Sequence, residues 1–455
     1  MTMVQELAAM VVQARYEDIS PAARQALKAR VLDSLGCAIG ALEGEPLGMI
    51  RQQLADFGGT EHCTLIGGGR TAPDRAAFYN GALVRYLDFN DAYAAKGESC
   101  HPSDNLAPVL AAAEYAGRHG RDLLCALAVA YQVQCRLSDV APVRAKGFDH
   151  TTEGSYAAAA GVAKALELDQ TKTAHAVAIS GTAYNALRVT RTGALSHWKG
   201  LAYPSTAMTA THAAFLAMRG ITGPLEVFEG NKGYMETIAG PFTLDWARED
   251  LERVTATAIK KYNAELHSQS ALEAVLELRQ EAGFDGDDVE RVEIDSFDVA
   301  HNIIGGGEEG SKILVRTKEE ADHSMPYMVA VAILDGQVLP EQYAAERIAR
   351  ADVQDLLRRV TVRPIEEYSR QFPELLPNRV SVHLRNGRVL VRAKPDYEGY
   401  PTRPMSWPAV VGKFQRLAAR HADVALQGAL VEAVANLETV PVASLTALLA
   451  KIGKA

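Results

Sequence analysis

Cysteine is scarce in this chain of 455 residues, and long apolar runs are missing. The five cysteines include no C-x-x-C pair, which argues against a zinc ribbon and against the usual local spacings of iron–sulfur ligands. An odd number of cysteines in so long a chain is no disulfide framework and favours a reducing compartment. No apolar run reaches the roughly 18 residues that cross a bilayer, so no membrane partner is expected.

Nucleotide and metal motifs are also missing. The Gly67–Gly69 run lacks the G-x-G-x-x-G spacing and the strand–turn–helix context of a dinucleotide site. The Asp285–Asp288 run lacks the remaining ligands of a calcium loop. There is no H-E-x-x-H, and the histidines form no closely spaced metal pair. We therefore expect neither a cofactor nor a metal.

Charge and length narrow the class further. A net charge of −9 argues against a broad nucleic-acid surface, although one small basic pocket can still bind an anion. The amino-terminal Met1–Arg15 segment has neither a basic start nor an apolar signal core, so a cytoplasmic protein is expected, or one in a matrix reached without a recognisable transit peptide. The length exceeds the roughly 250–300 residues at which single cores stop growing, which predicts two domains.

The first half of the sequence predicts helices. Ser20 and Pro21 form a helix start, and the apolar residues of the Leu27–Ile39 segment then recur every four positions. Further alanine-rich segments are typical of closely packed core helices: Leu106–Gly117, Leu123–Val133, Tyr156–Leu168, Thr173–Ala183 and Ala207–Met218.

The pattern changes after about Ala264. Short β-like runs occur at Val289–Phe297, Val360–Val362, Val380–Leu384 and Val389–Val391. The last two flank Asn386 and Gly387, the favoured two-residue hairpin turn, and helical stretches lie between the earlier runs. Helical patterning resumes near Met405. The expected fold is mostly α with two domains: a large helical domain of residues 1–264, completed by 400–455, and a smaller, lid-like α+β domain of 265–399.

Two histidines occur in polar segments that precede helices. His101 follows the acidic Asp88–Asp91 loop, and its residue type suits proton transfer near neutral pH. The positive end of the helix that follows favours a bound carboxylate. His150 is a second acid or base, or only a helix cap. The alternative for both segments is capping and hydrogen bonding without a reactive role.

A basic stretch stands out in this acidic chain. Arg188 and Arg191 carry guanidinium groups, which suit bidentate binding of carboxylates. Lys199 follows in the Ser196–Gly200 segment, where it can bind a carboxylate, or act as an acid or base if burial lowers its pKa. A solvated surface cluster is the alternative, but the neighbouring Trp198 favours a packed loop.

Three later segments add candidates. Lys261 and His267 lie at the predicted domain boundary, where binding sites often form. The hydroxyl of Tyr327 can orient a substrate, or the segment is simply a helix start with proline in its first turn. Arg403 adds one more guanidinium, close to the cap of the last helical region.

These segments together resemble the MmgE/PrpD family over nearly the whole chain. The resemblance implies a homodimer with a large helical domain and a smaller α+β domain, which acts without a cofactor. The motifs that carry it are Asp88–Asn105, Asn185–Ala202, Phe228–Gly233, Lys261–Ser270 and Ala321–Leu334. The family's active-site positions fall on Asp88, His101, His150, Lys199, Lys261 and Tyr327. Arg188, Arg191, His267 and Arg403 are the expected substrate-binding groups.

Three motifs are most similar to the 2-methylcitrate dehydratase branch: D-F-N-D with C-H-P-S-D-N, R-V-T-R-T-G, and K-Y-N-A-E-x-H-S-Q-S. That branch implies a hydro-lyase acting on 2-methylcitrate or citrate, with one histidine as acid and the other as base in an order left open. Ala92 departs from the pattern, because a threonine is expected there. The missing hydroxyl removes one possible hydrogen bond to the substrate.

Three alternatives stay open at this point. A cis-aconitate decarboxylase or an iminodisuccinate epimerase of the same family can share the proton abstraction and differ in the later step. Lys199 can instead be the Schiff-base lysine of a pyridoxal enzyme. The chain can also be a helical scaffold that has kept only its packing.

Overall fold

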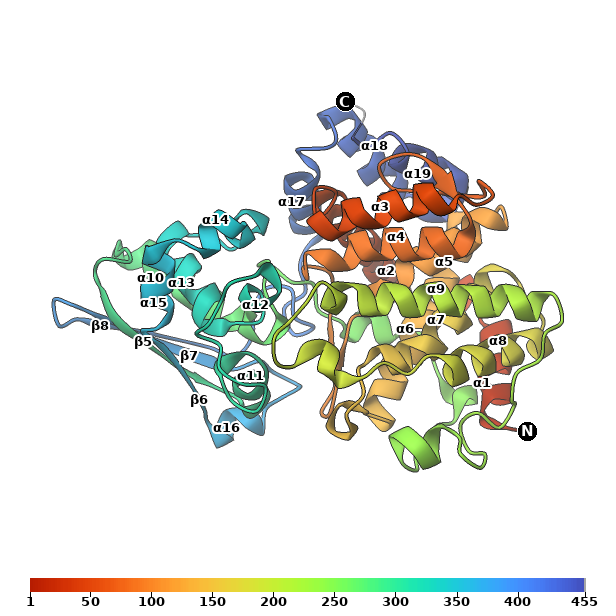
Figure 1. Ribbon diagram of the computed structural model, residues 1–455, viewed down its shortest axis with the longest axis horizontal. Helices are drawn as coiled ribbons and strands as arrows, with labels where there is room; N and C mark the ends of the chain where they lie inside the picture. Colours follow the sequence, from red (N-terminus) through yellow and green to blue (C-terminus); the bar gives the residue numbers. More distant parts are fainter. Residues whose placement is uncertain (454–455) are drawn as a thin grey trace. The chain divides into compact units, whose positions relative to one another are not determined.

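The computed structural model describes residues 1–453 and divides the chain into two compact units (Figure 1). The first unit contains Met1–Thr190, Gly200–Thr257 and the chain from Ser406 onward. The second contains Arg191–Lys199 and Ala258–Met405. Helices predominate, and a four-stranded sheet lies in the second unit, so the predicted fold class of mostly α with two domains is confirmed.

The second unit has different limits from the predicted domain. It begins at Ala258 and ends at Met405, compared with the predicted 265 and 399, and it includes residues 191–199. The reason for the last difference is long-range, because Lys199 forms a buried ion pair with Asp322 of the same unit. No sequence pattern within residues 191–199 predicts such a contact.

Helix α2, Pro21–Gly40, shows how the local sequence sets an element. Ser20 caps it, since its side chain accepts a hydrogen bond from the backbone N–H of Ala23, and Pro21 occupies the first turn. The predicted helix start is therefore confirmed. The helices that follow α2 in the chain include α4 (Pro73–Tyr86), α5 (Leu106–Tyr115), α6 (Gly120–Val140), α7 (Thr151–Ala165), α8 (Gln170–Ala183) and α9 (Trp198–Met218).

The core of the first unit lies along α6 and α7, which are buried over most of their length. Small residues permit the close packing there: a Cβ on Gly161 of α7 would lie 2.9 Å from the Cβ of Ala130 on α6. Real Cβ atoms do not approach one another this closely, so only glycine fits where the two helices cross. The unit also contains α1 (Met3–Gln13), α3 (Glu45–Phe57) and the two-stranded pairs β1–β2 (Cys63–Thr64, Arg70–Thr71) and β3–β4 (Tyr93–Ala94, Ser99–Cys100).

The end of the described chain packs back onto the beginning of the first unit. Helix α17, Trp407–Ala418, lies against α2, and α18 (Val424–Ala435) and α19 (Val442–Leu449) follow it (Figure 1). Two glycines of α2 form the contact surface. A Cβ on Gly36 would lie 3.1 Å from the Cα of Phe414, and one on Gly40 would lie 3.3 Å from the side chain of Leu417. The missing side chains allow the two backbones to approach closely.

The second unit is built on one mixed sheet with strand order β6-β5-β7-β8. Its strands are β5 (Val289–Ser296), β6 (Val360–Pro364), β7 (Asn378–Leu384) and β8 (Val389–Lys394). β5 pairs with β6 in parallel, and the other two pairings are antiparallel. The predicted hairpin between β7 and β8 is confirmed: Gly387 has φ +84°, a left-handed conformation that glycine adopts without strain.

Helices α10 (Gln269–Ala282) and α13 (Met325–Asp335) supply the rest of this unit's core, and α10 contacts both β7 and β8. Almost every residue of α13 is buried, in agreement with its continuous apolar sequence. The shorter helices are α11 (Asp298–Ala300), α12 (Lys318–Ala321), α14 (Ala345–Ile348), α15 (Ala351–Leu357) and α16 (Glu366–Ser369). Among residues 1–453, no helix combines the length and the apolar character that crossing a membrane requires.

Candidate active site

The first candidate segment follows the end of α4 as a tight loop. Asp88 has φ +55°, an uncommon left-handed conformation for a residue other than glycine. Its side chain is almost completely buried, and its Oδ1 accepts a hydrogen bond of 2.6 Å from Nη1 of Arg85. Nε of Arg85 lies 3.7 Å from Oδ2 of Asp104, so one guanidinium joins the loop to the segment that carries His101. Buried charges of this kind are stable only when paired.

His101 is held through the backbone of the same loop. Its Nδ1 lies 2.7 Å from the carbonyl oxygen of Asp91. A carbonyl can only accept a hydrogen bond, so Nδ1 carries a proton and donates it. In neutral His101 the basic nitrogen is therefore Nε2.

Asp91 is itself fixed at its side chain. Oδ1 accepts a hydrogen bond from the backbone N–H of Ser103, and Oδ2 accepts one from the hydroxyl of Tyr131 on α6. Burial raises the pKa of Asp91, although these hydrogen bonds oppose the shift. The carbonyl that faces His101 thus belongs to an anchored residue.

His150 lies next to His101 at the start of α7. The two ring centroids are 5.5 Å apart, with an edge-to-face angle of 65°. Nδ1 of His150 lies 3.4 Å from Oδ1 of Asp149, a fully buried carboxylate, and Arg188 lies on the other side of that carboxylate, with Nη1 3.8 Å from Oδ2. A neighbouring carboxylate stabilises the protonated form of a histidine. The two histidines therefore have different surroundings: a neutral carbonyl faces one, and a carboxylate faces the other.

Tyr203 of α9 completes this part of the first unit. Its hydroxyl donates a hydrogen bond of 2.8 Å to Oδ1 of Asn105, and its ring is stacked on that of His150 at a centroid distance of 6.5 Å. Sequence reasoning missed Tyr203, Arg85 and the special role of Asp149. Asp149 directly precedes His150 and could have been predicted from the sequence, whereas the contacts of Tyr203 depend on helix packing.

Two buried carboxyl groups near the histidines were also missed. Glu153 follows His150 on α7 and is fully buried, and neither of its carboxyl oxygens has a hydrogen-bond partner among the described residues. Burial raises its pKa well above the ordinary value, and the charge of Glu98 adds to the shift. Burial also raises the pKa of Glu98 to about 7. No sequence motif marked either group, because both depend on desolvation in the folded unit.

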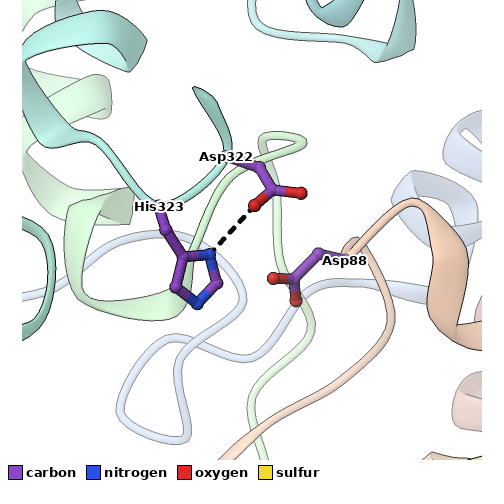
Figure 2. Close-up of side chains that lie close together, drawn as sticks. All are labelled: Asp88, Asp322 and His323. Carbon is purple, nitrogen blue, oxygen red and sulfur yellow. Dashed lines mark hydrogen bonds and ion pairs between the residues drawn. The ribbon is translucent and has the colours of Figure 1, made fainter. Parts of the chain in front are cut away.

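Lys199 has its partners in the second unit. Its ammonium group pairs with Oδ1 of Asp322, and Nζ of Lys318 lies 2.7 Å from the other carboxylate oxygen. Figure 2 shows the third contact of this carboxylate, the hydrogen bond of 2.9 Å to Nδ1 of His323. Burial alone would raise the pKa of Asp322, but the charges of Lys199 and Lys318 and the bond to His323 hold it below its usual range. Lys199 is therefore a buried, ion-paired cation and no part of a solvated surface cluster.

His267 and Tyr327 are both fully buried in the same unit. Nδ1 of His267 lies 2.7 Å from Oε1 of Glu265, and its ring contacts those of Phe297 and Phe372. Burial opposes ionisation of Glu265, but the charges of His267 and nearby cations lower its pKa to about 2. The Tyr327 hydroxyl donates a hydrogen bond to the backbone carbonyl of Gln342, and burial raises its pKa.

Lys261 and Arg403 meet at one carboxylate. Nζ of Lys261 lies 3.3 Å from Oε1 of Glu273, and Nη1 of Arg403 lies 3.0 Å from Oε2. Burial opposes the ionisation of Glu273, but these two cations and Lys394 bring its pKa to about 2. Arg191 is buried as well. The structure thus joins His101 with His150, and Lys261 with Arg403, whereas Lys199, His267 and Tyr327 each have separate partners.

Comparison with known proteins adds two family models. The model described as the MmgE/PrpD N-terminal domain matches residues 5–247. The model described as the MmgE/PrpD C-terminal domain matches residues 262–439. Together they account for most of both units.

Individual relatives are similar over most of their own length. A 2-methylcitrate dehydratase from Cupriavidus necator is 28% identical over 467 aligned positions, which cover 94% of this chain and 93% of that protein. An alkylcitrate dehydratase from a fungal species is 28% identical, with 86% and 82% covered. A cis-aconitate decarboxylase from Mus musculus is 25% identical, also with 86% and 82% covered. These values are too similar to one another to separate dehydration from decarboxylation.

Proposed function

The chain belongs to the MmgE/PrpD family, and we propose that it is a hydro-lyase that dehydrates 2-methylcitrate by acid–base catalysis without a cofactor. One observation carries this proposal: two histidines lie 5.5 Å apart in the first unit, one facing a carbonyl and the other a carboxylate. The relatives named 2-methylcitrate dehydratase support the choice of substrate, with 28% identity in one case over nearly the full length of both chains.

Dehydration requires a base and an acid at neighbouring carbons. A proton leaves the carbon beside one carboxylate, hydroxide leaves the adjacent carbon, and the products are an alkene and water. We assign the base to His101, because its Nδ1–H donates a hydrogen bond to the Asp91 carbonyl and the basic lone pair is therefore on Nε2. We assign the acid to His150, because the carboxylate of Asp149 stabilises its protonated form. Protonation of the departing hydroxide by His150 balances the proton that His101 takes up.

Negative charge builds up on the substrate as the proton leaves. An ionised carboxylate acidifies the adjacent C–H only weakly, so fixed cations must stabilise the transition state. We propose that Lys199 supplies one of these charges, because it is a buried ammonium group with fixed partners. Arg188, held beside Asp149, is the candidate for binding a substrate carboxylate. Catalytic roles for Asp88, Lys261 and Tyr327 stay predictions, as do substrate-binding roles for Arg191, His267 and Arg403.

A substrate panel tests the proposal. Purified protein is assayed side by side with 2-methylcitrate, citrate, cis-aconitate and iminodisuccinate, before and after dialysis against EDTA. We expect the highest kcat/KM with 2-methylcitrate, formation of an unsaturated tricarboxylate, and unchanged activity after dialysis. Lys199→Ala should lower kcat at least about a hundredfold.

Other results of the panel are equally informative. Release of carbon dioxide from cis-aconitate at a higher kcat/KM would replace the proposal with a decarboxylase, a possibility favoured by the mouse relative. Preferential conversion of iminodisuccinate would indicate an epimerase. A yellow absorbance lost with activity on dialysis would indicate a pyridoxal enzyme. No turnover, with no rise in Tm on adding tricarboxylates, would indicate a scaffold.

A further inference from the structure

Lys413 of α17 has a largely buried side chain that lies against the loop before His101. Its Nζ donates a hydrogen bond of 2.8 Å to the carbonyl oxygen of Phe89 and lies 3.7 Å from the centroid of the Phe89 ring. The same Nζ lies 2.7 Å from Oδ1 of Asp33 on α2. The side chain of Lys413 is only 8% exposed, and that of Asp33 is fully buried.

A contribution to folding stability does not by itself explain why this ion pair is buried. Removing two charges from water costs several kcal/mol per ion, and well-packed apolar residues often replace a buried pair without loss. Burial raises the pKa of Asp33, which shows that the interior resists its ionisation even with Lys413 beside it. Because burying this ion pair costs free energy, its presence is better explained by the segment that Lys413 holds in place.

What Lys413 holds is one end of the Asp88–Asp91 loop. At the other end, the side chain of Asp91 is anchored to Ser103 and Tyr131, and its carbonyl accepts the Nδ1–H of His101. Phe89 lies between the left-handed Asp88 and this carbonyl. Fixing the carbonyl of Phe89 therefore limits how far the peptide groups between Asp88 and Asp91 can rotate.

From these contacts we propose that Lys413 is a positioning residue for His101: it holds the Asp88–Asp91 loop so that the Asp91 carbonyl keeps His101 in the Nδ1–H form. Lys413 does not contact the reacting atoms and acts through the loop. The effect on turnover rests on the proposed function, whereas the effect on the histidine tautomer does not. This difference allows the two proposals to fail separately.

The first measurement is the tautomer itself. The protein is labelled with ¹⁵N-histidine, and the two ring nitrogens of His101 are assigned by comparison with His101→Asn. In the wild type we expect the shifts of one neutral tautomer, protonated at Nδ1. In Lys413→Met we expect averaged shifts from both tautomers, because the loop is released. Unchanged shifts of His101 in a folded Lys413→Met protein would overturn the proposal.

The second measurement separates positioning from packing. Lys413→Met with Asp33→Leu removes both charges and keeps the volume apolar, so its Tm should approach that of the wild type. We expect the double variant to keep the mixed tautomers, and to lose about tenfold to a hundredfold in kcat with KM changed less than about threefold. Recovery of both the tautomer and kcat in the double variant would show a merely structural role and overturn the proposal.

Two further variants complete the design. Lys413→Arg keeps a charge and several donors, and should recover the single tautomer and part of kcat. Arg420→Met serves as the matched control, because Arg420 also pairs with an acidic residue near α2, Glu43, but both partners are exposed. The control should leave kcat and the His101 shifts unchanged. If the wild type shows the single tautomer but no turnover of 2-methylcitrate, the proposed function fails while the positioning role stands.

Discussion

At the scale of single residues, the candidate site shows how one residue type acquires two roles from its neighbours. His101 and His150 are similar in sequence context, since each lies in a polar segment that precedes a helix. Only the folded chain distinguishes them, through the Asp91 carbonyl on one side and the Asp149 carboxylate on the other. The sequence could therefore nominate both histidines, but it could not divide the work between them.

His101→Asn is the first residue-scale prediction. The asparagine amide can still donate to the Asp91 carbonyl, but it has no basic nitrogen in place of Nε2. We expect kcat to fall at least about a hundredfold while Tm changes little, as measured by steady-state kinetics and calorimetry. His212→Asn is the control, since His212 is exposed beside Asp74. A kcat near the wild-type value would remove His101 from the base role.

Glu153→Gln gives a prediction for stability against pH. The pKa of Glu153 is raised by burial in the folded protein, so above its ordinary value of 4.5 the folded state binds more protons than the unfolded state. The contribution of Glu153 to stability must then fall as the pH rises from about 5 toward 8, and the raised pKa of Glu98, about 7, acts in the same direction.

The glutamine variant is neutral at every pH and lacks this contribution. Its Tm, followed by calorimetry between about pH 5 and pH 8, should fall less steeply than that of the wild type. Glu6→Gln, at an exposed position of α1, should reproduce the wild-type slope. A slope for Glu153→Gln equal to or steeper than that of the wild type would mean that the pKa of Glu153 is not raised in the folded protein.

At the scale of elements, the α2–α17 contact depends on an absent side chain. Gly36 and Gly48 both lie inside helices, and alanine is favoured over glycine there by roughly 0.5–1 kcal/mol. A Cβ at Gly48 meets nothing within 4 Å, whereas one at Gly36 lies 3.1 Å from the backbone of Phe414.

We therefore expect Gly48→Ala to raise the free energy of unfolding and Gly36→Ala to give no gain or a loss. Denaturant titration of the two variants measures the difference directly. Because Phe414 is the neighbour of Lys413, Gly36→Ala should also lower kcat, whereas Gly48→Ala should not. Equal stabilisation by both substitutions would show that α17 can move away from α2 without cost.

Elements whose signals are local were predictable from the sequence. The Ser20–Pro21 helix start and the Asn386–Gly387 hairpin depend on hydrogen bonds and dihedral angles within a few residues, and both are present. The ion-pair partners were not predictable. Glu273 lies in an amphipathic helix, where nothing in the sequence distinguishes it from other acidic residues. Its carboxylate pairs with both Lys261 and Arg403 only because the folded chain brings distant segments together.

At the scale of the whole molecule, each unit is assembled from separated stretches of sequence. The second unit takes in residues 191–199, and the first takes in α17 and the helices that follow. Composition and length predicted two domains, and the return of helical patterning near Met405 predicted the completion of the first. The inclusion of 191–199 could not be predicted, because it depends on the pairing of Lys199 with Asp322, 123 positions later.

The hydrogen bond from Lys413 to Phe89 joins residues that are 324 positions apart, with the whole second unit between them in the sequence. A ribosome must therefore synthesise the whole second unit and the beginning of α17 before the loop that carries Asp88 can receive its last support. Until then, the growing polypeptide can form most helices of the first unit, but the proposed base has not yet acquired its fixed tautomer. Catalytic competence would therefore arrive only after α17 has been synthesised, as an abrupt event.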